Sequence, residues 1–135
     1  MIDYKIWLKR AKSAFLIASE TPLCDELYLE DLCYDAQQAV EKALKGLLIF
    51  YGVEPEYTHN IERSLIALEV FVEIPEIIKE TTELTQYAVL TRYPGEYDPV
   101  TLDEYKQAIK LAKECLDWVT EKIYTLKFTD TNTGV

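Results

Sequence analysis

The sequence is poor in glycine, proline and cysteine. Its 135 residues include four glycines and five prolines, and all of the prolines, with Gly52 and Gly95, stand between periodic apolar stretches. This composition excludes collagen-like and low-complexity chains and is typical of a globular domain. The three cysteines, Cys24, Cys33 and Cys115, form an odd set without C-x-x-C or Cys/His ligand spacing. They predict buried free thiols rather than a disulfide framework or a zinc site.

Positive charge and long apolar runs are also scarce. Lysine and arginine number 14 against 24 acidic residues, and the net charge of −10 repels phosphate backbones at long range. This charge argues against an unassisted general nucleic-acid binder, and any contact with a nucleic acid must be local. The apolar stretch "ALKGLLIFYGV" is interrupted by Lys45, and the amino terminus enters a charged helix rather than a signal peptide. These absences predict a cytoplasmic protein without a membrane span.

Apolar residues recur at intervals of three and four through most of the chain, and no segment has the alternation typical of a strand. The pattern predicts an all-α fold, an up-and-down bundle of about five helices, three long and two short, with the long helices roughly antiparallel. The second segment has the widest apolar face, which indicates a central helix. The expected helices span about residues 3–19, 25–51, 60–71, 75–91 and 101–125.

Capping residues define several of these boundaries. Asp3 is the expected N-cap of the first helix, and Gly52 the C-cap of the second. Thr58 or Asn60 would cap the third. Thr101 with Glu104 three residues later forms a capping box at the start of the fifth. We predict one domain over residues 1–126, followed by a flexible tail over residues 127–135.

Three separated motifs resemble the HEPN domain (higher eukaryotes and prokaryotes nucleotide-binding), in its small stand-alone prokaryotic form. They are "AQQAVEKALKGLL" in the second segment, then "THNI", then "LTRYPGEY". The resemblance covers about residues 4–124 and implies a bundle similar to the carboxy-terminal domain of kanamycin nucleotidyltransferase. It also implies a homodimer that partners a minimal nucleotidyltransferase, the two acting as a toxin–antitoxin pair. Neither a cofactor nor a metal is implied.

Active toxins of the resembled family are metal-independent endoribonucleases with an R-x(4–6)-H motif. The motif places its arginine at Arg92, but tyrosine, aspartate and proline occupy the positions where its histidine would follow. The sole histidine, His59, lies earlier in the chain. Tyr97, with an ordinary pKa near 10, is a poor proton-transfer group at neutral pH. We therefore predict that the chain is not an enzyme, with Arg92 and His59 as the only catalytic candidates.

The expected ligand-binding residues are polar or aromatic, and each also has a structural interpretation. Arg92 would clamp a phosphate or only complement a helix dipole. His59 would transfer a proton or only cap a helix. Tyr93 and Tyr97 would stack on a base or only cover a core edge. The side-chain amides of Gln37 and Gln38 would hydrogen-bond a nucleobase or only hydrogen-bond neighbouring groups of the protein.

Two further patterns have structural interpretations. Glu41 and Lys45 form a helical i, i+4 pair, which by itself explains their spacing. Glu56 and His59 have the spacing of a di-iron ligand pair, but that chemistry needs two copies on helices, so no metal is expected. Lysines also line one face of the first segment and one face of the fifth, where they would form a basic ridge if the two faces met.

Three functional hypotheses follow. The first is a nucleotide- or RNA-binding accessory protein, homodimeric and partnered by a minimal nucleotidyltransferase. The second is an endoribonuclease toxin in which two Arg92 side chains meet across a dimer axis near His59. The third is a non-catalytic interaction scaffold, which a stable complex with a co-expressed neighbour and no nucleotide-induced thermal shift would favour.

Overall fold

Three long helices form the body of the protein, which is described here from a computed structural model covering residues 2–90 and 98–133. Shorter helices lie between the second and third of them, and no strand occurs in the described ranges. The predicted all-α fold is confirmed. The long helices are α1 (Tyr4–Glu20), α2 (Leu29–Phe50) and α6 (Leu102–Thr133). The short ones are α3 (Ile61–Leu68), α4 (Glu76–Lys79), the 3-10 helix η1 (Glu80–Thr85) and α5 (Gln86–Leu90).

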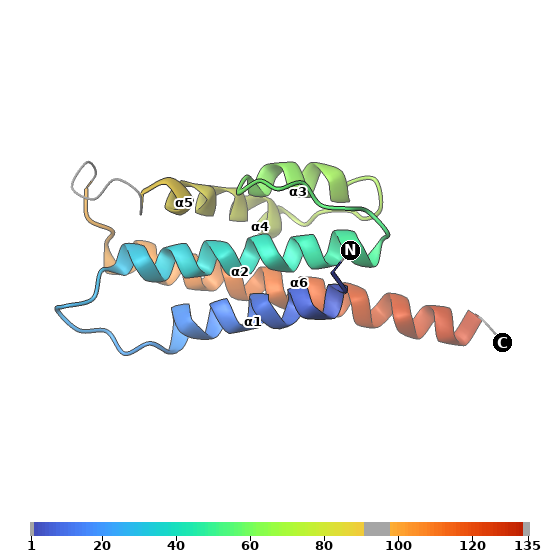
Figure 1. The fold of residues 1–135 in the computed structure, drawn as a ribbon, viewed down its shortest axis with the longest axis horizontal. Helices are drawn as coiled ribbons and strands as arrows, with labels where there is room; N and C mark the ends of the chain where they lie inside the picture. Colours follow the sequence, from blue (N-terminus) through green and yellow to red (C-terminus); the bar gives the residue numbers. More distant parts are fainter. Residues whose placement is uncertain (1, 91–97, 134–135) are drawn as a thin grey trace.

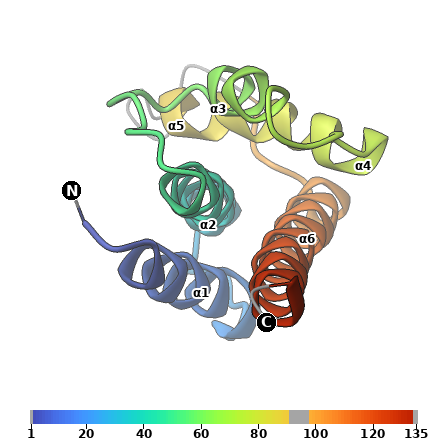
Figure 2. The ribbon, with the colours of Figure 1, turned by 90° about the vertical axis from the view of Figure 1, so that its right-hand side faces the viewer.

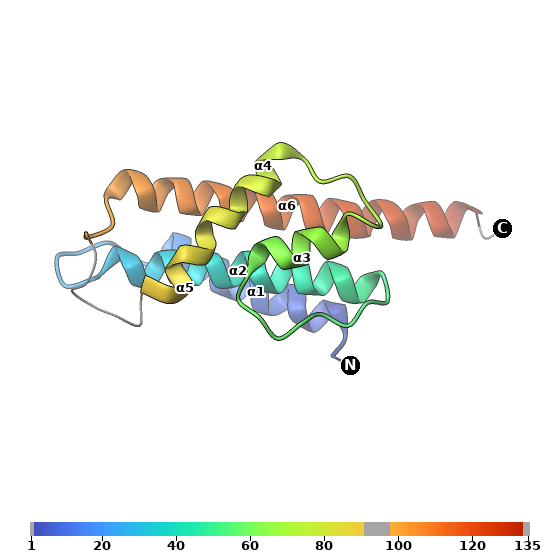
Figure 3. The ribbon, with the colours of Figure 1, turned by 90° about the horizontal axis from the view of Figure 1, so that it is seen from above.

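Helix α2 lies at the centre of the bundle. It packs against α1 on one side and against α3 and α5 on the other, while α6 lies along it (Figure 1; Figure 2). Helix α1 is antiparallel to α2, but α6 runs in the same direction as α2 (Figure 3). The expectation that the three long helices are all antiparallel is therefore wrong for α2 and α6. After α2 ends, the segment from α4 to α5 carries the chain back along the bundle, so that α6 starts at the same end as α2 (Figure 3).

The core is formed mainly by leucine, isoleucine, valine and alanine side chains of α2 and α6. Leu44 and Leu47 of α2 and Leu111 and Val119 of α6 are completely buried. Since each such side chain removes its apolar surface from water, this layer supplies much of the driving force for folding. No helix in the described part of the chain combines the length and the apolar character needed to cross a membrane.

The predicted caps at both ends of the bundle are confirmed. The backbone N–H of Lys5 donates to the Asp3 carboxylate at 2.8 Å at the start of α1. At the start of α6, the Thr101 N–H donates to the Glu104 carboxylate at 3.0 Å, and the Glu104 N–H donates to the Thr101 hydroxyl at 3.1 Å. This reciprocal pair is the capping box that the sequence predicts.

The connection between α2 and α3 contains the residues of the other two capping predictions. The C-cap of α2 is Tyr51, one residue before the expected Gly52, and Gly52 follows it with a φ of +84°, the left-handed conformation that glycine adopts without strain just past a helix end. Of the two candidates for the α3 cap, Asn60 fills the position, because its side chain accepts from the Glu62 N–H at 3.0 Å. Thr58 accepts instead from the N–H of Asn60 at 3.2 Å.

The expected single helix over residues 75–91 is divided into α4, η1 and α5. Threonines at the division donate their hydroxyls to carbonyls of the preceding turn, Thr81 to Ile78 at 2.6 Å and Thr82 to Lys79 at 3.0 Å. Such bonds compete with the regular α-helical pattern and favour a tighter turn. The division was not predicted because periodicity records which face is buried, not the local winding of the backbone.

Three other helix ends differ from expectation. Helix α2 begins at Leu29 rather than 25, because the Leu27 N–H closes a turn onto the Cys24 carbonyl at 3.1 Å. Helix α3 ends at Leu68, before the expected 71. Helix α6 continues to Thr133, past the expected 125, since no glycine or proline interrupts its sequence before that residue.

The cysteine prediction holds for two of the three thiols. Cys33 and Cys115 are buried free thiols, but Cys24 is exposed because it lies in the turn before α2. Burial raises the pKa of Cys33 to about 12 and also raises that of Cys115.

We expect a thiol-directed reagent at pH 8 to label Cys24 alone in the folded protein, because the two buried thiols are neither accessible nor ionised. Mass spectrometry of the intact protein should show one adduct, and three after unfolding in urea. Rapid native labelling of a second thiol would contradict the packing of α2 and α6 described above.

Candidate functional site

A buried carboxylate on α2 is the centre of a polar cluster. Glu41 is only 5% exposed, yet four side chains bond to it, three of them at less than 3 Å. The Lys45 ammonium donates to Oε1 at 2.7 Å, while Oε2 lies 2.9 Å from His59 Nδ1 and accepts from the Gln37 amide at 2.8 Å. Gln37, Glu41 and Lys45 follow one another at intervals of four on the helix, which places them on one face. His59 reaches this face from the loop before α3.

The two candidate glutamines serve this cluster differently. Gln37 is completely buried, and its amide nitrogen also lies 3.4 Å from the His59 carbonyl. Gln38 donates to the Gln37 side-chain oxygen at 2.8 Å and approaches Glu41 at 3.4 Å. These contacts make Gln37 a positioning residue that fixes both the carboxylate and the His59 loop. Direct ligand binding by either glutamine stays a prediction.

The other ring nitrogen of His59, Nε2, belongs to a side chain that is only half buried. This side chain is 49% exposed, and no described residue bonds to Nε2. Because a carboxylate can only accept, Nδ1 carries the proton of the bond to Glu41, which leaves Nε2 as an acceptor in the neutral ring and a donor in the imidazolium. The cap of α3 is Asn60, so the alternative role of His59 as the helix cap is not observed.

The environment of Glu41 stabilises its ionised form. Burial alone would raise the pKa of this carboxyl, but hydrogen bonds from Lys45, His59 and Gln37 together outweigh it. The pKa of Glu41 is consequently lowered from its ordinary value of about 4.3. The cluster therefore keeps a charged carboxylate inside the protein at neutral pH.

This lowered pKa predicts a contribution to stability that depends on pH. A carboxyl with a lower pKa in the folded state stabilises the protein fully above its unfolded pKa, and the contribution is lost as pH falls through the folded pKa. We expect the stability difference between wild type and Glu41→Gln, measured by urea unfolding, to be largest near pH 7. It should shrink below about pH 4.3. A difference that stays constant from pH 7 to pH 3 would contradict the assignment.

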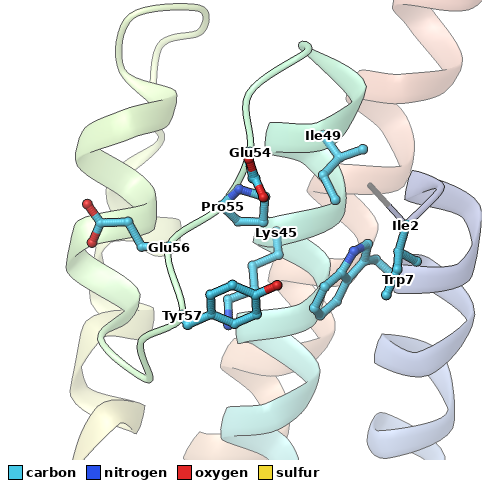
Figure 4. A pocket seen from close by; sticks show the side chains of 8 residues that line it. All are labelled: Ile2, Trp7, Lys45, Ile49, Glu54, Pro55, Glu56 and Tyr57. Carbon is cyan, nitrogen blue, oxygen red and sulfur yellow. The ribbon is translucent and has the colours of Figure 1, made fainter.

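Lys45 connects this cluster to a small surface pocket. Its ammonium lies 5.7 Å from the centroid of the Trp7 ring on α1, a distance at which a cation and an indole attract each other. The pocket has a volume of about 50 Å³, and its walls include Trp7 and Tyr57 (Figure 4). The central helix thus positions both the His59 cluster and the pocket.

Arg92, Tyr93 and Tyr97 lie outside the described residues, but the structure fixes the segments on either side of them. Before them, the hydroxyl of Thr85 accepts from the backbone N–H of Ile61 at 3.3 Å, just after His59 in the chain. After them, the buried Glu30 carboxylate of α2 accepts from the Val100 N–H at 3.0 Å. Both flanks are therefore anchored to elements that also build the cluster.

Some residues of the Glu56/His59 spacing and of the two lysine faces form ion pairs or line a groove in the structure. Glu56 pairs with Arg63 at 3.1 Å, and among the described residues no group of three metal-ligating side chains occurs. Lys113 on α6 pairs with Asp117 at 2.8 Å. Lys9 and Lys12 of α1 line a groove whose other side belongs to α6.

The sequence did not identify Glu41 as the organising residue of the cluster, because its pairing with Lys45 matched an ordinary exposed helical pair. The wide apolar face of the second segment could have indicated that the Glu41–Lys45 pair is buried. A helix that is packed on several sides has few exposed positions, so polar residues in its middle lie in the interior. Nearly every residue of α2 from Ala36 to Leu48 is buried, including Gln37, Glu41 and Lys45.

The arrangement defines an all-α helical-bundle domain with a buried carboxylate that orients a surface histidine. The model of the HEPN domain family matches residues 4–123, and the chain belongs to this family. TT1696 from Thermus thermophilus is 32% identical, with 90% of this chain and 99% of that chain covered and a TM-score of 0.77. ST0689, an archaeal HEPN homologue, is 29% identical, with 91% and 99% covered and a TM-score of 0.72. No curated protein matched the chain.

Proposed function

We propose that this HEPN domain is a cytoplasmic nucleotide- or RNA-binding accessory protein, a homodimer that partners a minimal nucleotidyltransferase. The observation that supports ligand binding most directly is the geometry of His59. A buried carboxylate holds Nδ1 at 2.9 Å, the His59 side chain is about half exposed, and no described residue bonds to Nε2. A histidine held in this way loses little side-chain entropy when it binds a ligand, since its ring orientation is already fixed.

The proposed ligand group is a phosphate. A protonated His59 would donate from Nε2 to a phosphate oxygen, and Arg92 would supply a bidentate guanidinium. Thr85 contacts the backbone just after His59, and Arg92 follows Thr85 by seven residues in the sequence. This short separation along the chain supports a shared site. Tyr93 and Tyr97 would stack on the base, which agrees with a local contact on a protein of net charge −10.

Titration with ATP and with a fluorescently labelled single-stranded RNA tests the proposal. We expect His59→Ala and Arg92→Ala each to weaken binding by about tenfold or more, because each removes a charge-assisted hydrogen bond. Arg63→Ala is the matched control, since it removes one exposed arginine that pairs with Glu56. Equal losses in all three variants, or no saturable binding by wild type, would contradict the proposal.

The Glu41–His59 pair also favours a second candidate, the metal-independent endoribonuclease. A carboxylate that orients an imidazole through Nδ1 leaves Nε2 positioned for general acid or base catalysis. In this case Arg92 would stabilise the developing charge at phosphorus, from the same copy or a second copy of the chain. Cleavage of labelled RNA that is lost in His59→Ala and strongly reduced in Glu41→Gln would support the enzyme. Intact RNA with saturable binding would support the accessory protein.

A further inference from the structure

An aromatic slot lies beside the polar cluster, on the surface shared by α1, α2 and the loop before α3. The name refers to Trp7 and Tyr57 as its walls, the Lys45 side chain between them, and Glu54 at the rim (Figure 4). Tyr57 is 97% exposed, so its ring makes almost no packing contact with the rest of the domain. Large exposed aromatic side chains next to an apolar pocket are typical of recognition surfaces.

The charges around the slot leave one carboxylate uncompensated. Lys45 is neutralised by Glu41 at 2.7 Å. Glu56, which points away from the slot in Figure 4, is paired with Arg63 at 3.1 Å. Glu54 is exposed and has no ion-pair partner among the described residues. The slot therefore combines two aromatic rings with one free negative charge.

We propose that the aromatic slot binds an arginine side chain presented by a protein partner. A guanidinium is planar, stacks on aromatic faces, and pairs with a carboxylate through two parallel hydrogen bonds. Tyr57 supplies an exposed face, Trp7 lines the slot beside the Lys45 ammonium, and Glu54 supplies the carboxylate. The pocket volume of about 50 Å³ offers room for the head of one side chain.

Charge also decides between occupants of this slot. A nucleotide would bring its phosphates next to Glu54, which repels them. A basic segment avoids this repulsion. Apolar neighbours of its arginine would pack on Ile2 and Ile49, which line the slot, and Ile2 is largely exposed.

Nuclear magnetic resonance of the tryptophan indole groups tests this inference on the full chain. The probe is the blocked peptide Ac-Leu-Arg-Leu-NH2, and its control replaces arginine with citrulline, which has the same shape without the charge. We expect the arginine peptide to shift the Trp7 indole signal saturably, and the citrulline peptide to bind several-fold more weakly. The Trp7 signal is the one that disappears in Trp7→Phe.

Matched variants identify the groups responsible. Glu54→Gln should weaken the arginine peptide by about three- to fivefold, the effect of one exposed ion pair, while Glu121→Gln, which removes an equal charge on α6, should not. Tyr57→Ala should weaken it similarly, and Tyr57→Phe should not. The inference would be overturned by equal shifts from both peptides, by equal effects of the two glutamate variants, or by a Trp7 response to AMP instead of arginine.

Discussion

Glu41→Ala is expected to lower the free energy of unfolding by about 3–5 kcal/mol, the largest effect we predict for one side chain of the cluster. The substitution removes a carboxylate that accepts from Lys45, His59 and Gln37. It also leaves the Lys45 ammonium buried without a counter-charge, and this uncompensated charge supplies most of the cost. Urea unfolding at pH 7, followed by circular dichroism, measures the change.

A double replacement distinguishes the energetic effect of losing the Glu41–Lys45 ion pair from the cost of leaving the Lys45 charge buried alone. Glu41→Leu combined with Lys45→Met replaces two buried charges with apolar side chains of similar size. This variant should recover most of the stability lost in Glu41→Ala, since apolar replacements of buried ion pairs are often neutral or stabilising. The account would be wrong if Glu41→Ala cost no more than about 0.5 kcal/mol, the usual limit for a surface substitution.

Gly46→Val should lower stability by about 1–3 kcal/mol by separating α1 from α2. A β-carbon at Gly46 would lie 3.2 Å from the side chains of both Leu8 and Trp7, and 3.4 Å from the Tyr4 carbonyl. Alanine therefore already meets a tight contact, which offsets its gain of about 1 kcal/mol in helix propensity over glycine. Valine adds two methyl groups for which the contact between the helices leaves no room.

Lys110→Val provides the matched control, because it places the same β-branched residue at an exposed position of α6. The comparison removes the intrinsic helix propensity of valine from the measured effect. Thermal unfolding of both variants should show a clearly lower midpoint for Gly46→Val. Similar midpoints would mean that α1 and α2 are farther apart at this position than the contacts of Gly46 indicate.

Most of the fold could be predicted because its determinants are local. The Asp3 cap, the Thr101–Glu104 capping box and the left-handed Gly52 are properties of a few neighbouring residues, and all are present in the structure. Helix direction is not local. Since the return of the chain depends on how α3, η1 and α5 pack on α2 and how α4 packs on α6, the parallel course of α2 and α6 could not be read from periodicity.

The candidate site was only partly predictable for the same reason. His59 was identified because it is the sole histidine, but its bond to Glu41 joins residues from two elements. The spacing of Glu41 and Lys45 looks the same on an exposed and on a buried helix face, so only packing on several sides of α2 shows that the pair is internal. The part of the site that depends on Arg92 stays a prediction.

The central claim is that Glu41 fixes His59 with its proton on Nδ1 and leaves Nε2 available to a ligand. Because the chain has a single histidine, nitrogen NMR of the imidazole reports this group without ambiguity. At a pH where the ring is neutral, we predict the tautomer protonated on Nδ1, and a shift toward the Nε2-protonated tautomer in Glu41→Ala. A wild-type ring protonated mainly on Nε2, unchanged by that substitution, would contradict the claim.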